Sequence, residues 1–159
     1  MEIKKILWLE DEFADFSAYR STLFRTGYVV EFVRSVSAAI GKIKDNKYVA
    51  YIFDIKVLPR ENEEWIDLDK KKREENPDFD SYLGLKLLRS LFDSDKAKIT
   101  LDPAIKAKVD PKKVIILSVV HDIIEEISFF GVPKNQILYK SCADLNTLPR
   151  LIKKIEEGE

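Results

Sequence analysis

Acidic side chains stand directly after two short apolar runs of this sequence. Residues 6–9 are followed by Glu10 and Asp11, and residues 49–53 are followed by Asp54. Buried strands of a parallel sheet have such apolar bodies, and their carboxyl ends open at one edge of the sheet. Neighbouring carboxylates repel one another unless protons or a cation lie between them. The pattern predicts an acidic crevice for a hard divalent ion, and magnesium, which keeps several waters, suits it better than calcium.

Two further polar groups follow apolar runs in the second half of the chain. Residues 114–117 lead into Ser118, and residues 136–139 lead into Lys140. A nucleophilic carboxylate, a metal ion, a hydroxyl donor and an ammonium group together can transfer and hold a phosphoryl group. The residue types therefore indicate phosphoryl chemistry, with one of the carboxylates as the nucleophile.

The hydrophobic periodicity predicts five strands, each followed by a helix. Strands are expected at about 6–9, 28–33, 49–53, 114–117 and 136–139, and helices at about 14–26, 36–43, 83–92, 121–130 and 144–157. Right-handed crossovers between such units give a doubly wound α/β fold, with a five-stranded parallel sheet covered on both faces. Its functional site is expected at the carboxyl ends of the strands.

Composition limits the classes of function that remain. The 159 residues suit a single domain spanning residues 1–159. Because 27 basic residues nearly balance 28 acidic ones, no direct nucleic-acid binding is expected. Cys142 and His121 are single, which excludes an intrachain disulfide and a zinc site of thiolates and imidazoles, and favours a cytoplasmic location. The apolar runs fall far short of the roughly 20 residues that cross a bilayer, so no membrane insertion is expected.

The ordered set of motifs resembles the signature of response-regulator receiver domains, of the chemotaxis-regulator type. The matching residues are Leu9-Glu10-Asp11-Glu12, Phe53-Asp54 with Pro59 five residues on, Leu117-Ser118, and Tyr139-Lys140-Ser141. The resemblance covers nearly the whole chain apart from two extra segments. It implies a flavodoxin-like receiver fold with strand order 2-1-3-4-5.

The resemblance also implies a role for each site residue. The magnesium ligands would be Glu10, Asp11, Asp54 and the backbone carbonyl of Lys56. Asp54 would accept a phosphoryl group from a histidine kinase or phosphotransfer protein, Ser118 would hydrogen-bond that group, and Lys140 would pair with it. The chain would then be a phosphoprotein of a two-component phosphorelay, with at most self-phosphorylation and self-dephosphorylation activity. A downstream protein partner is implied, and homodimerisation is left open.

Several positions depart from the receiver pattern. Receivers commonly have proline after the lysine, where this chain has Ser141. Many also have an aromatic residue three positions before the lysine, where this chain has Ile137. Between Asp54 and Gly84 lie far more residues than the family uses, which indicates an insertion at about 60–82, and a second excess of residues lies at about 93–113. These departures keep open an alternative, a receiver-like protein-binding module that is never phosphorylated.

A second alternative is a phosphohydrolase with an aspartyl nucleophile. Haloacid-dehalogenase-like enzymes of this class need another acid two residues after the nucleophile. This chain has Lys56 at that position, which counts against the class.

Overall fold

A computed structural model describes residues 2–57, 70–71, 74–76, 82–119, 122–141 and 143–158. Most of the insertion expected at 60–82 lies outside the described residues, as do Pro59, His121 and Cys142. The other elements named from the sequence fall within them.

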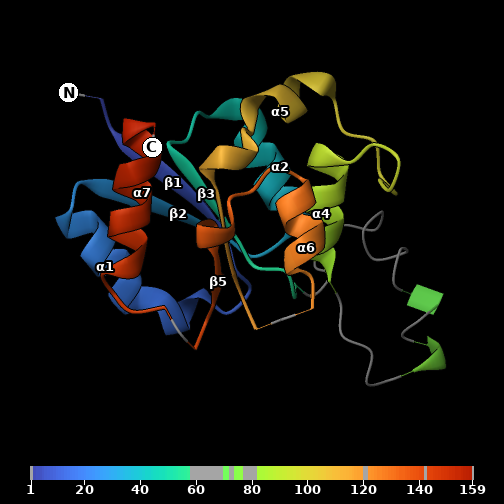
Figure 1. Ribbon diagram of the computed structural model, residues 1–159, viewed down its shortest axis with the longest axis horizontal. Coiled ribbons are helices and arrows are strands. Elements are labelled where there is room, and N and C mark those ends of the chain that lie inside the picture. The colour runs from blue at the N-terminus through green and yellow to red at the C-terminus, as the bar shows by residue number, and fades with distance from the viewer. Residues whose placement is uncertain are drawn as a thin grey trace.

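The core of the fold is one parallel sheet of five strands in the order β2-β1-β3-β4-β5 (Figure 1). The strands are β1 (Lys4–Leu9), β2 (Tyr28–Val33), β3 (Ala50–Phe53), β4 (Val114–Ser118) and β5 (Ile137–Tyr139). Five parallel strands in this order are what the sequence predicted. The three central strands have apolar bodies that are buried on both faces, as expected where helices cover both sides.

Helices cover both faces of this sheet, as Figure 1 shows. One face carries α1 (Ser17–Arg25) and α7 (Thr147–Glu157), and the other carries α2 (Val36–Asp45), α4 (Leu83–Phe92), α5 (Pro103–Lys108) and α6 (Ile124–Phe129). Short 3-10 turns occur as η1 (Phe13–Phe16), η2 (Pro111–Lys113) and η3 (Lys134–Gln136). No helix among the described residues has both the length and the apolar character needed to span a membrane.

Alternation along the strands divides the core into two layers. In β1, Ile6 and Trp8 pack beneath α1 and α7, whereas Leu7 and Leu9 pack toward the other helices. The helix expected at about 14–26 begins as the 3-10 turn η1 and becomes α-helical only at Ser17. The two layers hold the strand ends in fixed positions, which the site requires.

The second expected insertion, 93–113, folds into the helical layer. Asp102 caps α5 by accepting a hydrogen bond from the Ala104 N–H at 2.9 Å. Ile105 of α5 is buried in the core that α2 and α4 share, and the Tyr51 hydroxyl donates to the Lys108 carbonyl at 3.2 Å. This segment therefore extends the core on the α2 side and leaves the carboxyl ends of the strands uncovered.

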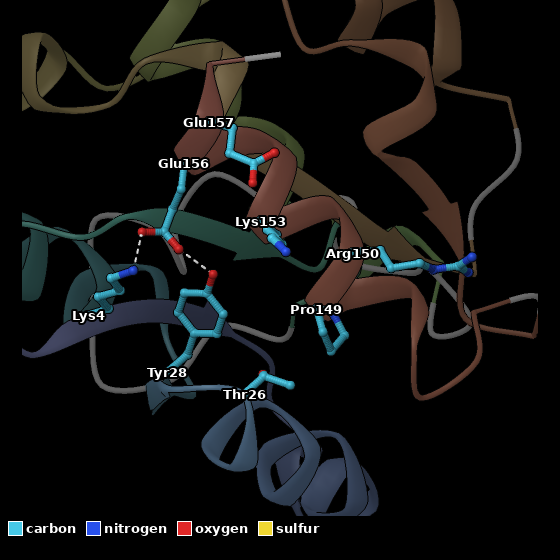
Figure 2. Close-up of a pocket in the computed structure, with 8 residues that line it drawn as sticks. All are labelled: Lys4, Thr26, Tyr28, Pro149, Arg150, Lys153, Glu156 and Glu157. Carbon is cyan, nitrogen blue, oxygen red and sulfur yellow. Dashed lines mark hydrogen bonds and ion pairs between the residues drawn. The ribbon is translucent and has the colours of Figure 1, made fainter.

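At the opposite, amino-terminal edge of the sheet, Glu156 joins three elements (Figure 2). Its carboxylate lies 2.9 Å from the Lys4 ammonium and accepts a hydrogen bond from the Tyr28 hydroxyl. A hollow of about 700 Å³ lies beside this cluster and is larger than the cavity at the carboxyl ends of the strands. Lys4 and Glu156 pair with each other and Tyr28 donates to the same carboxylate, so a structural role, tying α7 to β1 and β2, accounts for this cluster.

Removing the Tyr28 hydroxyl should weaken the fold in a pH-dependent way. Burial would raise the pKa of Glu156, but hydrogen bonds from Tyr28 and Lys4 outweigh it and lower the pKa. A carboxyl group whose pKa is lower in the folded than in the unfolded protein stabilises the fold at pH values above its unfolded pKa. This contribution is lost as the pH falls through its folded pKa. We expect Tyr28→Phe to cost about 1 kcal/mol at pH 7 and less at pH 3, measured by urea unfolding. An equal loss at both pH values would contradict this role.

Candidate functional site

The carboxyl ends of β1 and β3 bring three acidic side chains together. Glu10, Asp11 and Asp54 each place one carboxylate oxygen within 4.8 Å of the others. Backbone pairing sets this arrangement, because the Asp54 N–H donates to the Leu9 carbonyl and the Glu10 N–H donates to the Val33 carbonyl, both at 3.0 Å. The acids predicted from two separate strands thus lie side by side.

Lys140 enters the same site from the end of β5. Its ammonium lies 2.9 Å from Glu10 Oε2 and 3.1 Å from Asp54 Oδ2, and 5.3 Å from the centre of the Phe16 ring. The peptide bond from Lys140 to Ser141 is trans. The Lys140 N–H donates to the Ser118 carbonyl at 2.9 Å, which holds the backbone of Lys140 beside β4. Serine at position 141 therefore does not keep the lysine away from the acids.

Burial makes the charges of this site costly. It raises the pKa of Glu10 to about 7, the charge of Asp54 adds to this rise, and Lys140 opposes it. Burial also raises the pKa of Asp54, and the Lys140 ammonium again acts to lower it. Burial would lower the pKa of Lys140, but the two carboxylates raise it. One ammonium thus faces more negative charge than it can neutralise.

These acids fit a divalent cation. Glu10 Oε2 is buried, and among the described residues no well-aligned hydrogen bond satisfies it, although the Lys140 ammonium lies 2.9 Å away. A hard ion such as magnesium binds such oxygens. The Lys56 N–H donates to Asp54 Oδ1 at 3.3 Å, which holds residue 56 at the site. Binding of the metal by the Lys56 backbone carbonyl remains a prediction.

The cavity at these acids measures about 500 Å³. Its lining residues are Asp11, Glu12, Asp15, Phe16, Asp54, Lys56, Val119 and Lys140. The sequence did not predict Asp15, Phe16 or Val119 as lining residues. Asp15 and Phe16 come from η1, and a 3-10 turn after an acidic pair leaves no periodic signal.

Ser118 occupies the last position of β4 and is buried. The side chain that lines the cavity from this part of the chain is that of Val119, which directly follows it. The predicted hydrogen bond from the Ser118 hydroxyl to a phosphoryl group remains a prediction.

Gly84, the second residue of α4, packs directly against the phosphoacceptor candidate. Its N–H donates to the Ile55 carbonyl at 3.0 Å. A Cβ at this position would lie 1.8 Å from the backbone oxygen of Asp54, closer than any real contact. The absence of a side chain therefore lets α4 approach the backbone that carries Asp54.

Solved receiver domains share this architecture over almost their whole length. A CheY-like response-regulator receiver domain from Methanospirillum hungatei JF-1 aligns with a TM-score of 0.59 at 20% identity, covering 98% of this chain and 96% of that one. A response regulator from Chloroflexus aurantiacus J-10-fl aligns at 0.58 and 20% identity, covering 98% and 99%. The fold is that of a response-regulator receiver domain. No protein-family model and no curated protein sequence matches the chain.

Another receiver domain, from a sensor histidine kinase of Pseudomonas aeruginosa PAO1, has magnesium coordinated in its active-site cleft. It aligns with a TM-score of 0.51 at 15% identity, covering 98% of this chain and 99% of that one. At such identities the likeness shows the receiver fold alone. The chemistry open to the present chain depends on the acids and the lysine of its own site.

Proposed function

We propose that this chain is a phosphoacceptor switch, in which Asp54 accepts a phosphoryl group with the help of magnesium. One observation supports this proposal above the others: the Lys140 ammonium lies between Glu10 and Asp54, within 3.1 Å of both, at the carboxyl edge of the sheet. A buried carboxylate in contact with a cation and two further acids has the parts that phosphoryl transfer uses.

The reaction forms one bond and breaks another. An Asp54 carboxylate oxygen attacks phosphorus, and the bond from phosphorus to the nitrogen of a donor phosphohistidine breaks. Glu10, Asp11, Asp54 and the Lys56 carbonyl would hold magnesium, which neutralises charge on the phosphoryl oxygens when bound. Lys140 favours the ionised form of Asp54 before the reaction and pairs with the phosphoryl oxygens afterwards. Ser118 donates a hydrogen bond to the same group.

Phosphorylation would act through the segment that follows Ser118. This segment leads from β4 into α6, so a pull on Ser118 changes the relative stability of two arrangements of the surface around 121–140. The donor would be a cytoplasmic histidine kinase or phosphotransfer protein, and a downstream protein would bind one of the two arrangements.

Acetyl phosphate tests the proposed function directly. With magnesium, intact mass spectrometry should detect one added phosphate on the wild-type chain and none on Asp54→Asn. Asp15→Asn is a matched control, because Asp15 lines the same cavity without joining the group of three acids, and it should be phosphorylated normally. An unmodified wild type would favour the protein-binding module. Turnover of phosphomonoesters would favour the phosphohydrolase.

Magnesium alone should stabilise the fold. At ten times its dissociation constant, a ligand that binds only the folded state adds about 1.4 kcal/mol to the free energy of unfolding. We expect urea titrations with and without magnesium to show this gain in the wild type and a much smaller one in Asp11→Asn. The exposed Asp45→Asn, in α2, should behave like the wild type. An equal gain in Asp11→Asn and Asp45→Asn would show that magnesium binds away from Asp11.

A further inference from the structure

In the part of the chain that the structure describes, no strand pairs with the outer edge of β2. β2 pairs with β1 on one side and is the last strand in that direction. The Val33 carbonyl accepts from Glu10 on the β1 side, and backbone groups alternate along a strand. The N–H and C=O groups of Val30 and Phe32 therefore face outward, where no described residue bonds to them. An open edge of this kind can pair with another chain.

A groove about 530 Å³ in volume runs beside this edge. Four of its lining residues belong to α1 and two to β2: Arg20, Ser21, Phe24, Arg25, Val29 and Val30. The Phe24 side chain is 69% exposed, although its ring is large and apolar. A strand added to β2 would place alternate side chains on the face of Val30, next to Phe24. Val29, 37% exposed on the opposite face, offers apolar contact there.

Cationic side chains flank the groove. Arg20 lies over the Phe32 ring, 5.8 Å from its centre, and Arg25 contacts the Thr22 hydroxyl at 3.5 Å. Neither guanidinium forms an ion pair with a described residue. A second copy paired antiparallel through its own β2 would bring both pairs of arginines together on one face. Like charges disfavour that arrangement, whereas carboxylates complement it.

We propose that the β2 edge binds an extended segment of a partner protein in which acidic side chains flank an apolar one. The segment joins the sheet as a sixth strand, with main-chain hydrogen bonds to Val30 and Phe32. Its apolar side chain contacts Phe24, and its acids pair with Arg20 and Arg25. On one face of a strand, side chains recur every second residue, so acids two positions before and after the apolar residue fit. This site is separate from Asp54 and does not depend on the phosphoacceptor proposal.

A synthetic peptide tests this site. The blocked heptapeptide Thr-Asp-Thr-Val-Thr-Asp-Thr, titrated into ¹⁵N-labelled protein, should shift the amide signals of Val30 and Phe32 and slow their hydrogen exchange. Arg20→Glu with Arg25→Glu should weaken binding at least tenfold, and so should Phe24→Ser. Phe129→Ser is the matched control, because Phe129 is 82% exposed on α6, and it should bind like the wild type. Asp54→Asn should also bind normally.

Peptide variants separate this mode of binding from others without altering the protein. Methylation of the valine nitrogen removes a main-chain donor and should abolish binding, and lysine in place of both aspartates should do the same. Unchanged binding of either peptide would overturn the proposal. So would shifts that map away from β2 and α1. Protein-concentration-dependent shifts of β2 without peptide would show that a second copy occupies the edge, which also overturns it.

Discussion

Gly84→Ala should lower the free energy of unfolding by about 3 kcal/mol, near the upper end for an overpacked core position. The added methyl group would lie 1.8 Å from the Asp54 carbonyl oxygen, which belongs to backbone and cannot rotate away. Relief requires α4 to move off the sheet or β3 to shift. Either movement displaces Asp54 from Glu10 and Lys140, so phosphorylation by acetyl phosphate should fall together with stability.

Gly41 supplies the matched control for this substitution. It lies within α2, and a Cβ there would meet nothing within 4 Å. Glycine inside a helix costs about 0.5–1 kcal/mol relative to alanine, so Gly41→Ala should stabilise the protein by that amount. Urea unfolding of the two variants should thus give opposite signs for the same chemical change. Equal, small effects would show that α4 can retreat from Asp54 without cost.

The sequence predicted that side chains delivered by strand ends converge, and the structure brings them together. Apolar runs that end in Glu10, Asp54 and Lys140 identify strand ends, and parallel strands leave all such ends at one edge. The order of the strands also followed, because the resemblance to receivers implied it. The strand ends and the strand order were enough to predict that the acids converge.

The sequence was less informative where contacts join irregular segments. Phe16 lies under Lys140 because η1 turns it toward the site, and no periodicity marks a 3-10 turn. The direction of the Lys140 side chain could not be foreseen either, since receivers commonly have proline after this lysine and this chain has Ser141. The groove beside β2 could not be predicted from the sequence, because the sequence does not show that Phe24 lies exposed beyond the edge of the sheet and not in the core.

The second large effect concerns Lys140. Lys140→Met keeps the unbranched shape and most of the length of the side chain but removes its charge, which leaves Glu10 and Asp54 without the cation that lies 2.9 and 3.1 Å from them. Under the proposed function, the rate of phosphorylation by acetyl phosphate should fall about 100-fold, the typical loss when one group that stabilises developing charge is removed. Stopped reactions read by intact mass measure this rate.

A matched control and a spectroscopic observable distinguish this role from loss of the fold. Lys134→Met removes an exposed lysine of η3 and should phosphorylate at the wild-type rate. In the metal-free Lys140→Met protein, the pKa of Glu10 should rise above the wild-type value of about 7, because the ammonium that opposes burial is gone. Carboxyl ¹³C titration measures that shift. A rise in the pKa of Glu10 with an unchanged rate would show that Lys140 balances charge in the resting protein and takes no part in the transfer.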